Sequence, residues 1–385
     1  MSAAALRELR FPALAIDQVA EALDQWPEGS AEPLVNFAPG QSGFDVWRAL
    51  GEDPPALPIE RVVRYGDLAG SWRLRQQISQ GLSRRFGVDV APTQVCITNG
   101  GSEAIMLALH LLLQPGHELL MGRTCYPAYR PLHRLFGAKR TEVAVRPDGC
   151  LDMAALTGQV KGRDQVLLVN SPGNPLGGVM GAGELAELAE LPIPIIFDEV
   201  YQPLSLTKES VPSAMAYTDR HFVLGSFAKS LAVPGLRLGY LVSPREYADE
   251  VVNIKALLSV CSSFAAQYVM EHLLVHWDDL EGLHRAYLRH NHAHFTGCAR
   301  DLGLQFLTQP QAGLFAALAL PADLGSDSLG LALVLAREYG IGVVPSADFQ
   351  DQGPAFLRMN YSIQPEQIEP GLQRLAAAVR RLSAC

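Results

Sequence analysis

Short apolar runs rich in β-branched residues alternate with longer stretches of helical periodicity through the middle of the chain. The apolar runs predict strands at Val95–Thr98, Glu118–Met121, Val166–Asn170, Ile193–Phe197, His221–Gly225 and Arg237–Val242. Helices are predicted between them, among them Ser102–Leu113, Tyr129–Phe136 and Gly183–Glu190. Strands that are apolar almost throughout and alternate with helices predict an α/β fold with a mostly parallel central sheet, covered on both faces.

The two ends of the chain show a different pattern. Residues 1–35 predict a helix followed by a loop. Tyr247–Trp277, which has no internal Pro or Gly, predicts a long helical link to a second domain. From about Gly282 the pattern is that of a smaller α+β domain, with a helix through Glu338, a final amphipathic helix and strands around Gly313–Leu320, Ile341–Val344 and Phe356–Tyr361.

These patterns divide the chain into three segments. We expect residues 1–45 to form an N-terminal arm and part of the small domain. Residues 46–281 should form a large domain, and residues 282–385 a small C-terminal domain. Neither internal repeats nor low-complexity tracts occur in the sequence.

Charge and hydropathy exclude several classes of partner. The 385 residues carry a formal net charge of −9, so the chain offers no basic surface for nucleic acid or an anionic membrane. No apolar run approaches the ~18 residues that a membrane span requires. Four charged residues interrupt the apolar residues near the N-terminus, so no signal peptide is predicted: Arg7, Glu8, Arg10 and Asp17.

The six cysteines indicate neither a disulfide framework nor a metal site. No CxxC and no Cys/His metal spacing occurs among them, so no metal is predicted. Without a secretory signal they are expected to be reduced thiols, which places the protein in the cytoplasm.

Polar residues at strand ends indicate where a ligand binds. Asn170, Asp198 and Gly225 all fall at the carboxyl ends of predicted strands, which is where open α/β sheets bind ligands. Asn99-Gly100-Gly101-Ser102 joins another strand to a helix. Its glycines let the backbone approach an anion, and the helix N-terminus offers free N–H groups and a positive dipole end.

The most informative segment surrounds Lys229. It lies in Ser226-Phe227-Ala228-Lys229, and Arg237 follows eight residues later in a glycine-flanked, apolar context. Upstream, Asp198 ends an apolar run and Tyr201 follows it. A lysine that can form an imine, a hydroxyl and an arginine that can hold a phosphate, and a carboxylate at a strand end together indicate a pyridoxal 5'-phosphate (PLP) site.

With these motifs the chain resembles the fold-type I PLP enzymes, in particular the class I and II aminotransferases, from about Asn36 to Arg358. The resemblance implies the aspartate aminotransferase-like fold and a homodimer with shared active sites. It also implies ping-pong transfer of an amino group from an α-amino acid to a 2-oxo acid. Lys229 would hold PLP as an internal aldimine and shuttle the proton, which lysine can do because its pKa shifts readily.

The resemblance also assigns the other cofactor contacts. It implies that Gly101, Ser102, Ser226 and Arg237 hold the phosphate, with Ala228 where many members have a second serine. It also implies that Tyr126 stacks on the pyridine ring and that Asp198 pairs with the pyridinium nitrogen. Asn174 and Tyr201 would donate to the phenolic oxygen. Leu176 stands where the family usually has a threonine.

Three further residues are implied for the substrate and the dimer. Arg358 would grip the substrate α-carboxylate, Asn174 would also contact the substrate, and Gly40 would belong to a loop that closes over the substrate. Tyr65 would reach the phosphate of the neighbouring subunit's cofactor. Gln41-Ser42-Gly43 departs from the commoner sequence of that loop.

Several alternatives stay open at this stage. Asp198 has the sequence context of a helix N-cap, Tyr126 that of a core tyrosine before a turn, and Arg237 by itself that of a surface arginine. The same site residues would serve β/γ-elimination, side-chain cyclisation or amino-acid oxidation on PLP. A regulatory module that senses PLP would need a DNA-binding segment, for which there is no room before Asn36.

The substrate side chain is not indicated. A dicarboxylate would need an additional cation, and none can be assigned from spacing. Phe37, Phe44 and Trp47 would suit an apolar or aromatic donor if they face the substrate, and are packing residues if they do not.

Overall fold

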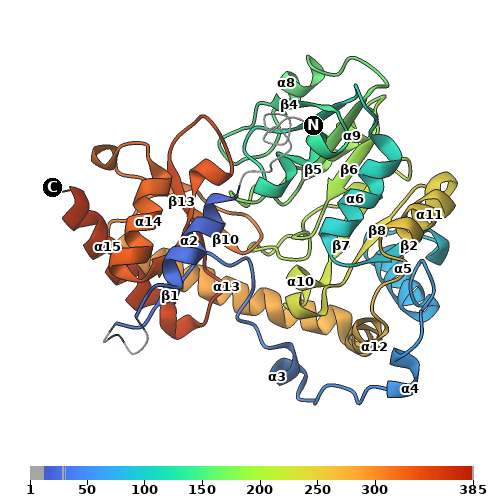
Figure 1. The fold of residues 1–385 in the computed structure, drawn as a ribbon, viewed down its shortest axis with the longest axis horizontal. Coiled ribbons are helices and arrows are strands. Elements are labelled where there is room, and N and C mark those ends of the chain that lie inside the picture. Colours follow the sequence, from blue (N-terminus) through green and yellow to red (C-terminus); the bar gives the residue numbers. More distant parts are fainter. Residues whose placement is uncertain (1–12, 28–29, 31, 384–385) are drawn as a thin grey trace, which may run out of the picture.

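The computed structural model describes residues 13–27, 30 and 32–383 of the chain. Two bodies of secondary structure lie side by side, joined by the long helix α13 (Trp277–Asp301) (Figure 1). The predicted α/β fold with a mostly parallel central sheet is confirmed. Among the described residues, no helix combines the length and the apolar character that a membrane crossing requires.

The larger body contains a seven-stranded sheet in the order β2-β8-β7-β6-β5-β3-β4. Its strands are β2 (Val95–Thr98), β3 (Glu118–Gly122), β4 (Lys139–Val143), β5 (Gln165–Asn170), β6 (Ile195–Asp198), β7 (Phe222–Ser226) and β8 (Gly239–Val242). All pairings are parallel except those of β8, which runs antiparallel to both β2 and β7. The helices of this body are α3 (Val46–Leu50), α4 (Ile59–Val62), α5 (Trp72–Phe86), α6 (Gly101–Leu112), α7 (Leu132–Leu135), α8 (Met153–Thr157), α9 (Ala182–Ala189), α10 (Phe227–Ser230), α11 (Ala248–Leu258) and α12 (Phe264–Leu273).

Successive side chains of a strand point to opposite faces of this sheet, so each face packs against a hydrophobic core of its own. Leu120 and Leu167 belong to the core that includes α5, while Met121 and Leu168 belong to the core that includes α6. Each fully buried aliphatic side chain contributes about 1.5–3 kcal/mol. The predicted strands are found within a few residues of their expected bounds. β4, an edge strand of polar sequence, was not predicted because a strand at a sheet edge needs no apolar run.

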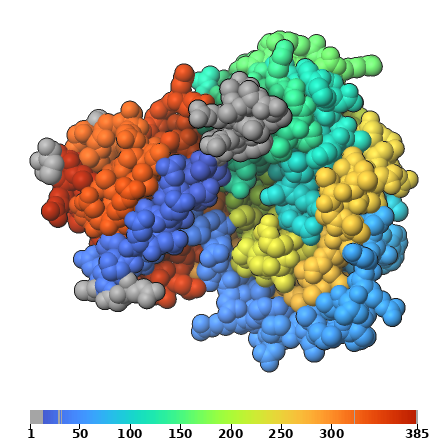
Figure 2. Space-filling model, in the orientation of Figure 1, coloured from blue at the N-terminus to red at the C-terminus, as the bar shows by residue number. Residues whose placement is uncertain are grey.

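The smaller body is built from both ends of the chain. Its elements are α2 (Ala15–Leu23), β1 (Val35–Asn36), β9 (Phe306–Thr308), β10 (Phe315–Ala319), α14 (Ser328–Tyr339), β11 (Ile341–Gly342), β12 (Val344–Pro345), β13 (Phe356–Asn360) and α15 (Pro365–Ser383). An antiparallel sheet has the order β12-β13-β10-β9, and β1 pairs in parallel with β11. In Figure 2 the blue N-terminal residues accordingly lie against the orange and red C-terminal ones. The helix predicted within residues 1–35 is α2, and residues 1–12 lie outside the described part.

Two helix predictions were wrong. The expected helix Tyr129–Phe136 is interrupted, because Pro131 precedes the short α7. Tyr247–Trp277 is not one linking helix. It divides after Leu258, where Val260 adopts φ +63°, and α12 begins anew behind the capping hydroxyl of Ser263. The connection to the smaller body is α13 instead.

We propose domain boundaries near 45/46 and 281/282. Phe37 packs in the core of the smaller body, whereas Val46 packs in that of the larger one. Along α13, Leu280 belongs to the core of the larger body and Leu288 to that of the smaller one. Both proposed boundaries therefore fall where the chain changes core, although the second lies inside an unbroken helix.

Candidate active site

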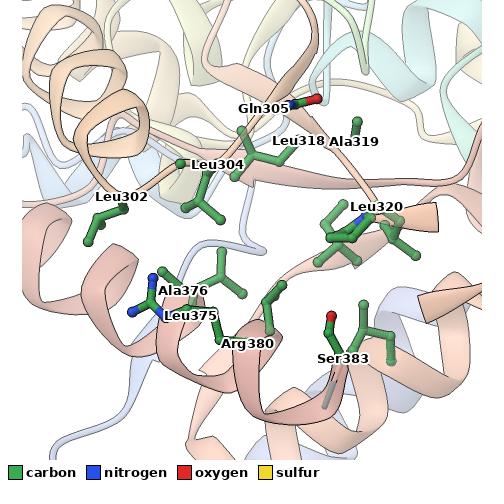
Figure 3. Close-up of a pocket in the computed structure, with 15 residues that line it drawn as sticks. Leu302, Leu304, Gln305, Leu318, Ala319, Leu320, Leu375, Ala376, Arg380 and Ser383 are labelled. Atoms are coloured by element: carbon green, nitrogen blue, oxygen red, sulfur yellow. The ribbon is translucent and has the colours of Figure 1, made fainter. Parts of the chain in front are cut away.

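A cavity of about 360 Å³ lies between the two bodies, beyond the carboxyl ends of β5, β6 and β7. All the predicted site residues except Tyr65 line it: Gly40, Gly101, Ser102, Tyr126, Asn174, Asp198, Tyr201, Ser226, Lys229, Arg237 and Arg358. A hollow of about 650 Å³ exists elsewhere, in the smaller body, and is lined mainly by leucines such as Leu304 and Leu318 (Figure 3). None of the predicted site residues lines that larger hollow, so chemistry rather than size identifies the candidate site.

Lys229 lies on the short helix α10, which begins directly after β7. Its amine donates a hydrogen bond to the carbonyl of Gly40. Burial, and then the nearby cations Arg358 and Arg237, lower the pKa of Lys229 to about 8. An amine with this pKa is partly neutral near neutral pH, and only a neutral amine is a nucleophile or a base.

Asp198 ends β6 and is buried. Its carboxylate accepts hydrogen bonds from the hydroxyl of Tyr129 and, at 3.1 Å, from the backbone N–H of Val200. Burial raises the pKa of Asp198 to about 6, against the effect of these hydrogen bonds. A cation placed beside this carboxylate would favour its ionised form again.

The glycine-containing loop between β2 and α6 is held by its own backbone conformation and by neighbouring side chains. Gly100 adopts φ +79°, which favours glycine, and a Cβ there would lie only 3.0 Å from Nη2 of Arg237. The carboxylate of Glu103 accepts from the backbone N–H of Asn99, at 2.6 Å, and from the fully buried amine of Lys255, at 2.9 Å. This partly buried ion pair holds the first turn of α6, and the free backbone N–H groups of that turn belong to residues that line the cavity.

Ser226 and Arg237 face this same loop. Ser226 is buried at the end of β7, while Arg237 is exposed but still lines the cavity. Within the part of the chain that the structure describes, the hydroxyls of Ser102 and Ser226 have no hydrogen-bond partner. Donors that converge on one cavity without protein partners are suited to hold an anionic group.

Two tyrosines and an asparagine also line the cavity. Tyr126 is more than one-third exposed, and its ring meets that of Tyr129 edge to face at 5.3 Å. Tyr201 is buried, and its ring centroid is 5.9 Å from the amine of Lys229. The backbone N–H of Asn174 donates to Oδ1 of Asn170 at 2.9 Å, and this bond holds Asn174 at the cavity wall.

Arg358 projects from β13 into the cavity and is buried. Its Nη1 donates to Oδ1 of Asn174 at 3.2 Å and its Nη2 to the carbonyl of Ala38 at 2.6 Å. The guanidinium carbon lies 3.9 Å from the ring centroid of Phe315, and Nε has no partner among the described residues. Burial lowers the pKa of Arg358 to about 10, against the opposing effect of Tyr201, Tyr126 and Asp348, so the guanidinium stays charged. Within the described residues it forms no salt bridge with a carboxylate.

The segment around Gly40 is held by residues far away in sequence. The amide of Asn360 donates to the carbonyls of Pro39, at 2.7 Å, and Gln41, at 2.6 Å. His284 of α13 connects Ser42, at 2.9 Å, with the carbonyl of Ser230, at 2.9 Å. These bonds connect this loop both to the smaller body and to the residue that follows Lys229.

Tyr65 and the three aromatic candidates for substrate binding lie elsewhere. Tyr65 is 86% exposed and lines a surface hollow with Arg61 and Arg64, away from the cavity of the same chain. Of the aromatic candidates, Phe37 is buried against Phe295, Phe44 stacks on His284, and Trp47 stacks on His272. They are therefore packing residues within this chain.

Sequence reasoning missed three residues of the site. Tyr129 donates a hydrogen bond to Asp198. The ring of Phe315 stacks against the guanidinium of Arg358. Asn360 holds the Gly40 loop through hydrogen bonds to its backbone. Tyr129 could have been considered from the sequence, because it follows the predicted site residue Tyr126 by three positions. Phe315 and Asn360 gave none, because each acts through a residue distant in sequence.

Comparison with known proteins supports the same reading of the chain. The sequence profile described as "Aminotransferase class I and II" matches residues 33–375. A putative aminotransferase of Bacillus subtilis, YugH, is 28% identical over 356 residues, covering 89% of this chain and 91% of that protein. An aspartate aminotransferase of Thermotoga maritima is 26% identical over 353 residues, covering 89% and 91%.

Solved structures show the same fold. The crystal structure of a Thermotoga maritima aspartate aminotransferase superposes with a TM-score of 0.84 at 24% identity, covering 97% of this chain and 98% of that one. YbdL of Escherichia coli, described as having a methionine aminotransferase function, superposes with a TM-score of 0.86 at 19% identity, covering 96% and 98%. The predicted aspartate aminotransferase-like fold is thereby confirmed, and the chain belongs to the class I and II aminotransferases, enzymes that generally depend on PLP.

Proposed function

We propose that this enzyme binds PLP at the cavity around Lys229 and transfers an amino group from an α-amino acid to a 2-oxo acid by ping-pong turnover. The observation that carries the proposal is the meeting of three groups in one cavity. They are an amine of lowered pKa, a buried carboxylate and a buried arginine that forms no salt bridge within the described residues: Lys229, Asp198 and Arg358.

The residues present fit the cofactor. Its phosphate would meet the N–H groups at the start of α6, the hydroxyls of Ser102 and Ser226, and the guanidinium of Arg237. Asp198 would accept from the pyridinium nitrogen, and Tyr126 offers a partly exposed ring face beside the same cavity. The hydroxyl of Tyr201 and the amide of Asn174 would donate to the phenolic oxygen.

When bound, PLP supplies an electron sink that stabilises the negative charge left when the substrate Cα–H bond breaks. Lys229 would carry the cofactor covalently, give it up to the substrate amine, and then hold or return the proton at Nζ. Its position against the Gly40 carbonyl keeps Nζ inside the cavity. The closely packed loop around Gly40 would limit access of water to that proton.

Arg358 is proposed to bind the substrate α-carboxylate. The stacked ring of Phe315 and the bonds to Asn174 and Ala38 fix the plane of the guanidinium, so it is oriented before substrate arrives. Among the described residues that line the cavity, the cations are Lys229, Arg237 and Arg358, and each already has a proposed role. A second carboxylate on the substrate would therefore need a cation from the partner subunit.

A single-turnover screen tests the proposed function. The purified PLP form is mixed with each common amino acid, and the loss of the lysine-bound absorbance is followed together with the appearance of the amine form. Formation of one 2-oxo acid per amine form supports transamination. Release of ammonia or of a side-chain fragment without the amine form would contradict it and indicate one of the other PLP reactions.

In this assay Arg358→Lys should lower kcat/KM for α-amino acids by roughly 10- to 100-fold, because a charge-assisted hydrogen bond contributes about 1.5–3 kcal/mol and lysine cannot reproduce the two parallel bonds. Simple amines without the carboxylate are the internal control and should change far less. Comparable losses for both classes would show that Arg358 supports the fold of the cavity and does not read the substrate.

We also propose that the enzyme is a homodimer in which Tyr65 reaches the cofactor phosphate of the partner. The segment that carries Tyr65 also exposes apolar side chains, since Ile59 is 65% exposed and Val63 78%. Exposed apolar patches of this kind mark association surfaces. The described tyrosines that line the cavity of a single chain have other roles: Tyr129 donates to Asp198, and Tyr126 and Tyr201 are proposed to contact the ring and the phenolic oxygen.

Subunit complementation checks the shared site. Lys229→Ala and Tyr65→Asp should each be inactive, because each site of either homodimer carries the defect. In a mixed dimer one site carries both defects and the other neither, so about half of the wild-type activity per mixed dimer should return, or about a quarter for a random equimolar mixture. No recovery, despite subunit exchange shown by a size-tagged partner, would exclude a site shared through Tyr65.

We propose a cytoplasmic location as well. The cysteines support it, since Cys96, Cys125, Cys150, Cys261 and Cys298 are all free thiols. Cys385 lies outside the described residues.

A further inference from the structure

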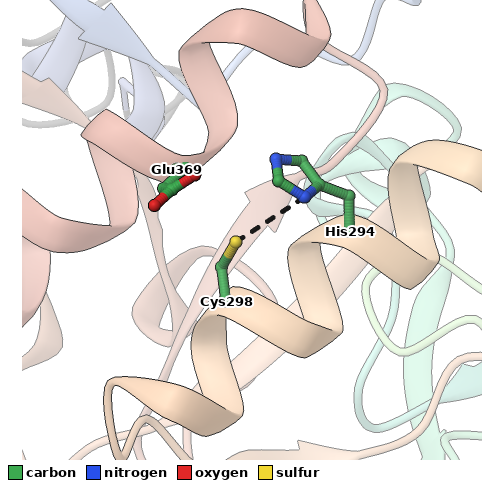
Figure 4. Close-up of side chains that lie close together, drawn as sticks. All are labelled: His294, Cys298 and Glu369. Carbon is green, nitrogen blue, oxygen red and sulfur yellow. Dashed lines mark hydrogen bonds between the residues drawn. The ribbon is translucent and has the colours of Figure 1, made fainter.

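Three side chains with metal-binding chemistry meet between α13 and α15, and none of them lines the active-site cavity. His294 and Cys298 come from α13, and Glu369 comes from α15. The candidate ligand atoms of all three lie within 4.8 Å of one another. Figure 4 shows Glu369 facing the imidazole and the thiol across the space between the two helices.

The pair on α13 already has the separation of two zinc ligands. Residues four apart on a helix project from the same face, so His294 and Cys298 point together. Nδ1 of His294 lies 3.7 Å from Sγ of Cys298. Tetrahedral zinc, with Zn–S near 2.3 Å and Zn–N near 2.0–2.1 Å, separates such a pair of ligands by about 3.6 Å. The two side chains can therefore chelate one ion without changing rotamer.

Glu369 needs only a small movement to complete the set. Its side chain is exposed, and Gln373 of the same helix donates to its Oε1 at 3.0 Å. An exposed carboxylate adjusts easily, and an approach of about 1 Å would give the spacing of a tetrahedral ligand. A thiol–imidazole hydrogen bond by itself accounts for two of the groups but gives no reason for a carboxylate from another helix to face them.

We propose that His294, Cys298 and Glu369 bind one Zn²⁺ per chain, with water in the fourth position. The mixture of sulfur, nitrogen and oxygen ligands suits Zn²⁺ and disfavours Mg²⁺ and Ca²⁺, which require oxygen ligands. The thiol proton is released to solvent on binding. The ion would join α13, the helix that connects the two bodies, to the C-terminal helix α15, and so would stabilise the smaller body.

The site is independent of the proposed reaction at Lys229. No metal was predicted from the sequence, because no CxxC or Cys/His metal spacing was identified among the six cysteines. His294 and Cys298 instead form a helical pair four residues apart, and the third ligand comes from a helix about 70 residues further on.

Metal binding by the PLP-loaded full-length protein tests the proposal. Zn²⁺ should bind with one equivalent per chain in competition with a chromophoric chelator. Co²⁺ should give the visible d–d absorption of a tetrahedral thiolate site, at wavelengths longer than those at which PLP absorbs. His294→Ala and Cys298→Ser should each lower the affinity at least about tenfold and abolish that spectrum, because each removes a ligand.

Two further variants make the result decisive. Cys261→Ser removes another partly exposed thiol outside the cluster and should leave binding unchanged. Glu369→Gln alters only an exposed side chain, so it should fold normally and still weaken binding measurably. Zn²⁺ should also raise the thermal midpoint of the wild type and leave that of His294→Ala unchanged. Absence of binding at millimolar Zn²⁺, or binding that survives both His294→Ala and Cys298→Ser, would overturn the proposal.

Discussion

Lys229→Ala should abolish turnover, with a loss of at least about 10⁴-fold, while the protein remains folded. The substitution removes both the covalent attachment of the cofactor and the base at the reacting carbon, and a positioned base by itself contributes about 10²–10⁴-fold. The side chain lines the cavity and, among the described residues, hydrogen-bonds only to the Gly40 carbonyl, so its removal should leave the cores undisturbed. Steady-state kinetics measures the loss of turnover, and single-turnover kinetics measures the loss of the step at the reacting carbon. Circular dichroism checks that the variant is folded.

Two comparisons make the assignment specific. Lys208→Ala, which removes an exposed lysine, should leave turnover unchanged. Borohydride reduction of the PLP-loaded enzyme, followed by peptide mapping, identifies the lysine that carries the cofactor. A pyridoxyl label on any lysine other than Lys229 would remove the basis of the proposed mechanism.

Asp198→Ala should still bind PLP but lose roughly 10²–10³-fold in kcat, the range seen when one preorganised electrostatic group is removed. Its carboxylate is buried at the end of β6, where a pyridinium nitrogen would need a negative partner. Without that partner the ring nitrogen loses its proton and withdraws electrons less strongly. Binding of PLP is measured by absorbance titration, and kcat at saturating substrate.

Conservative variants separate charge from packing at this position. Asp198→Asn keeps an acceptor for Tyr129 but not the charge, so it should be about as slow as Asp198→Ala. Tyr129→Phe removes the hydrogen-bond donor and leaves the carboxylate of Asp198 in place. Loss of that bond should raise the pKa of Asp198 further. The loss of rate should be smaller than in either Asp198 variant. Near wild-type turnover in Asp198→Ala would show that this carboxylate is only structural.

The sequence predicted those parts of the fold and site that depend on local pattern. Strands such as β2 and β5 contain continuous apolar runs, and the site residues Asp198 and Ser226 are the last residues of strands of this kind. Side chains at the ends of parallel neighbours must meet, so their spacing along the chain predicted a common cavity.

The remainder depends on contacts that no local pattern contains. Phe315 and Asn360 act on Arg358 and on the Gly40 loop only because β10 and β13 pair and lie beside the N-terminal segment. The division of Tyr247–Trp277 after Leu258 is set by backbone conformation at Val260, where a β-branched residue would not be expected. The role of Tyr65 depends on a second chain.

The pairing of β1 with β11 has a consequence for the order of events during synthesis. About 300 residues separate Val35 from its partner Ile341. At ribosomal rates of about 5–20 residues per second, the first strand waits roughly 15–60 s for the second. Throughout this time the apolar face of α2, with Val19 and Leu23, lacks the α14 surface that covers it in the finished protein. A nascent chain released before β11 would therefore expose the apolar face of α2 and lack Arg358, which makes α2 a binding target for chaperones.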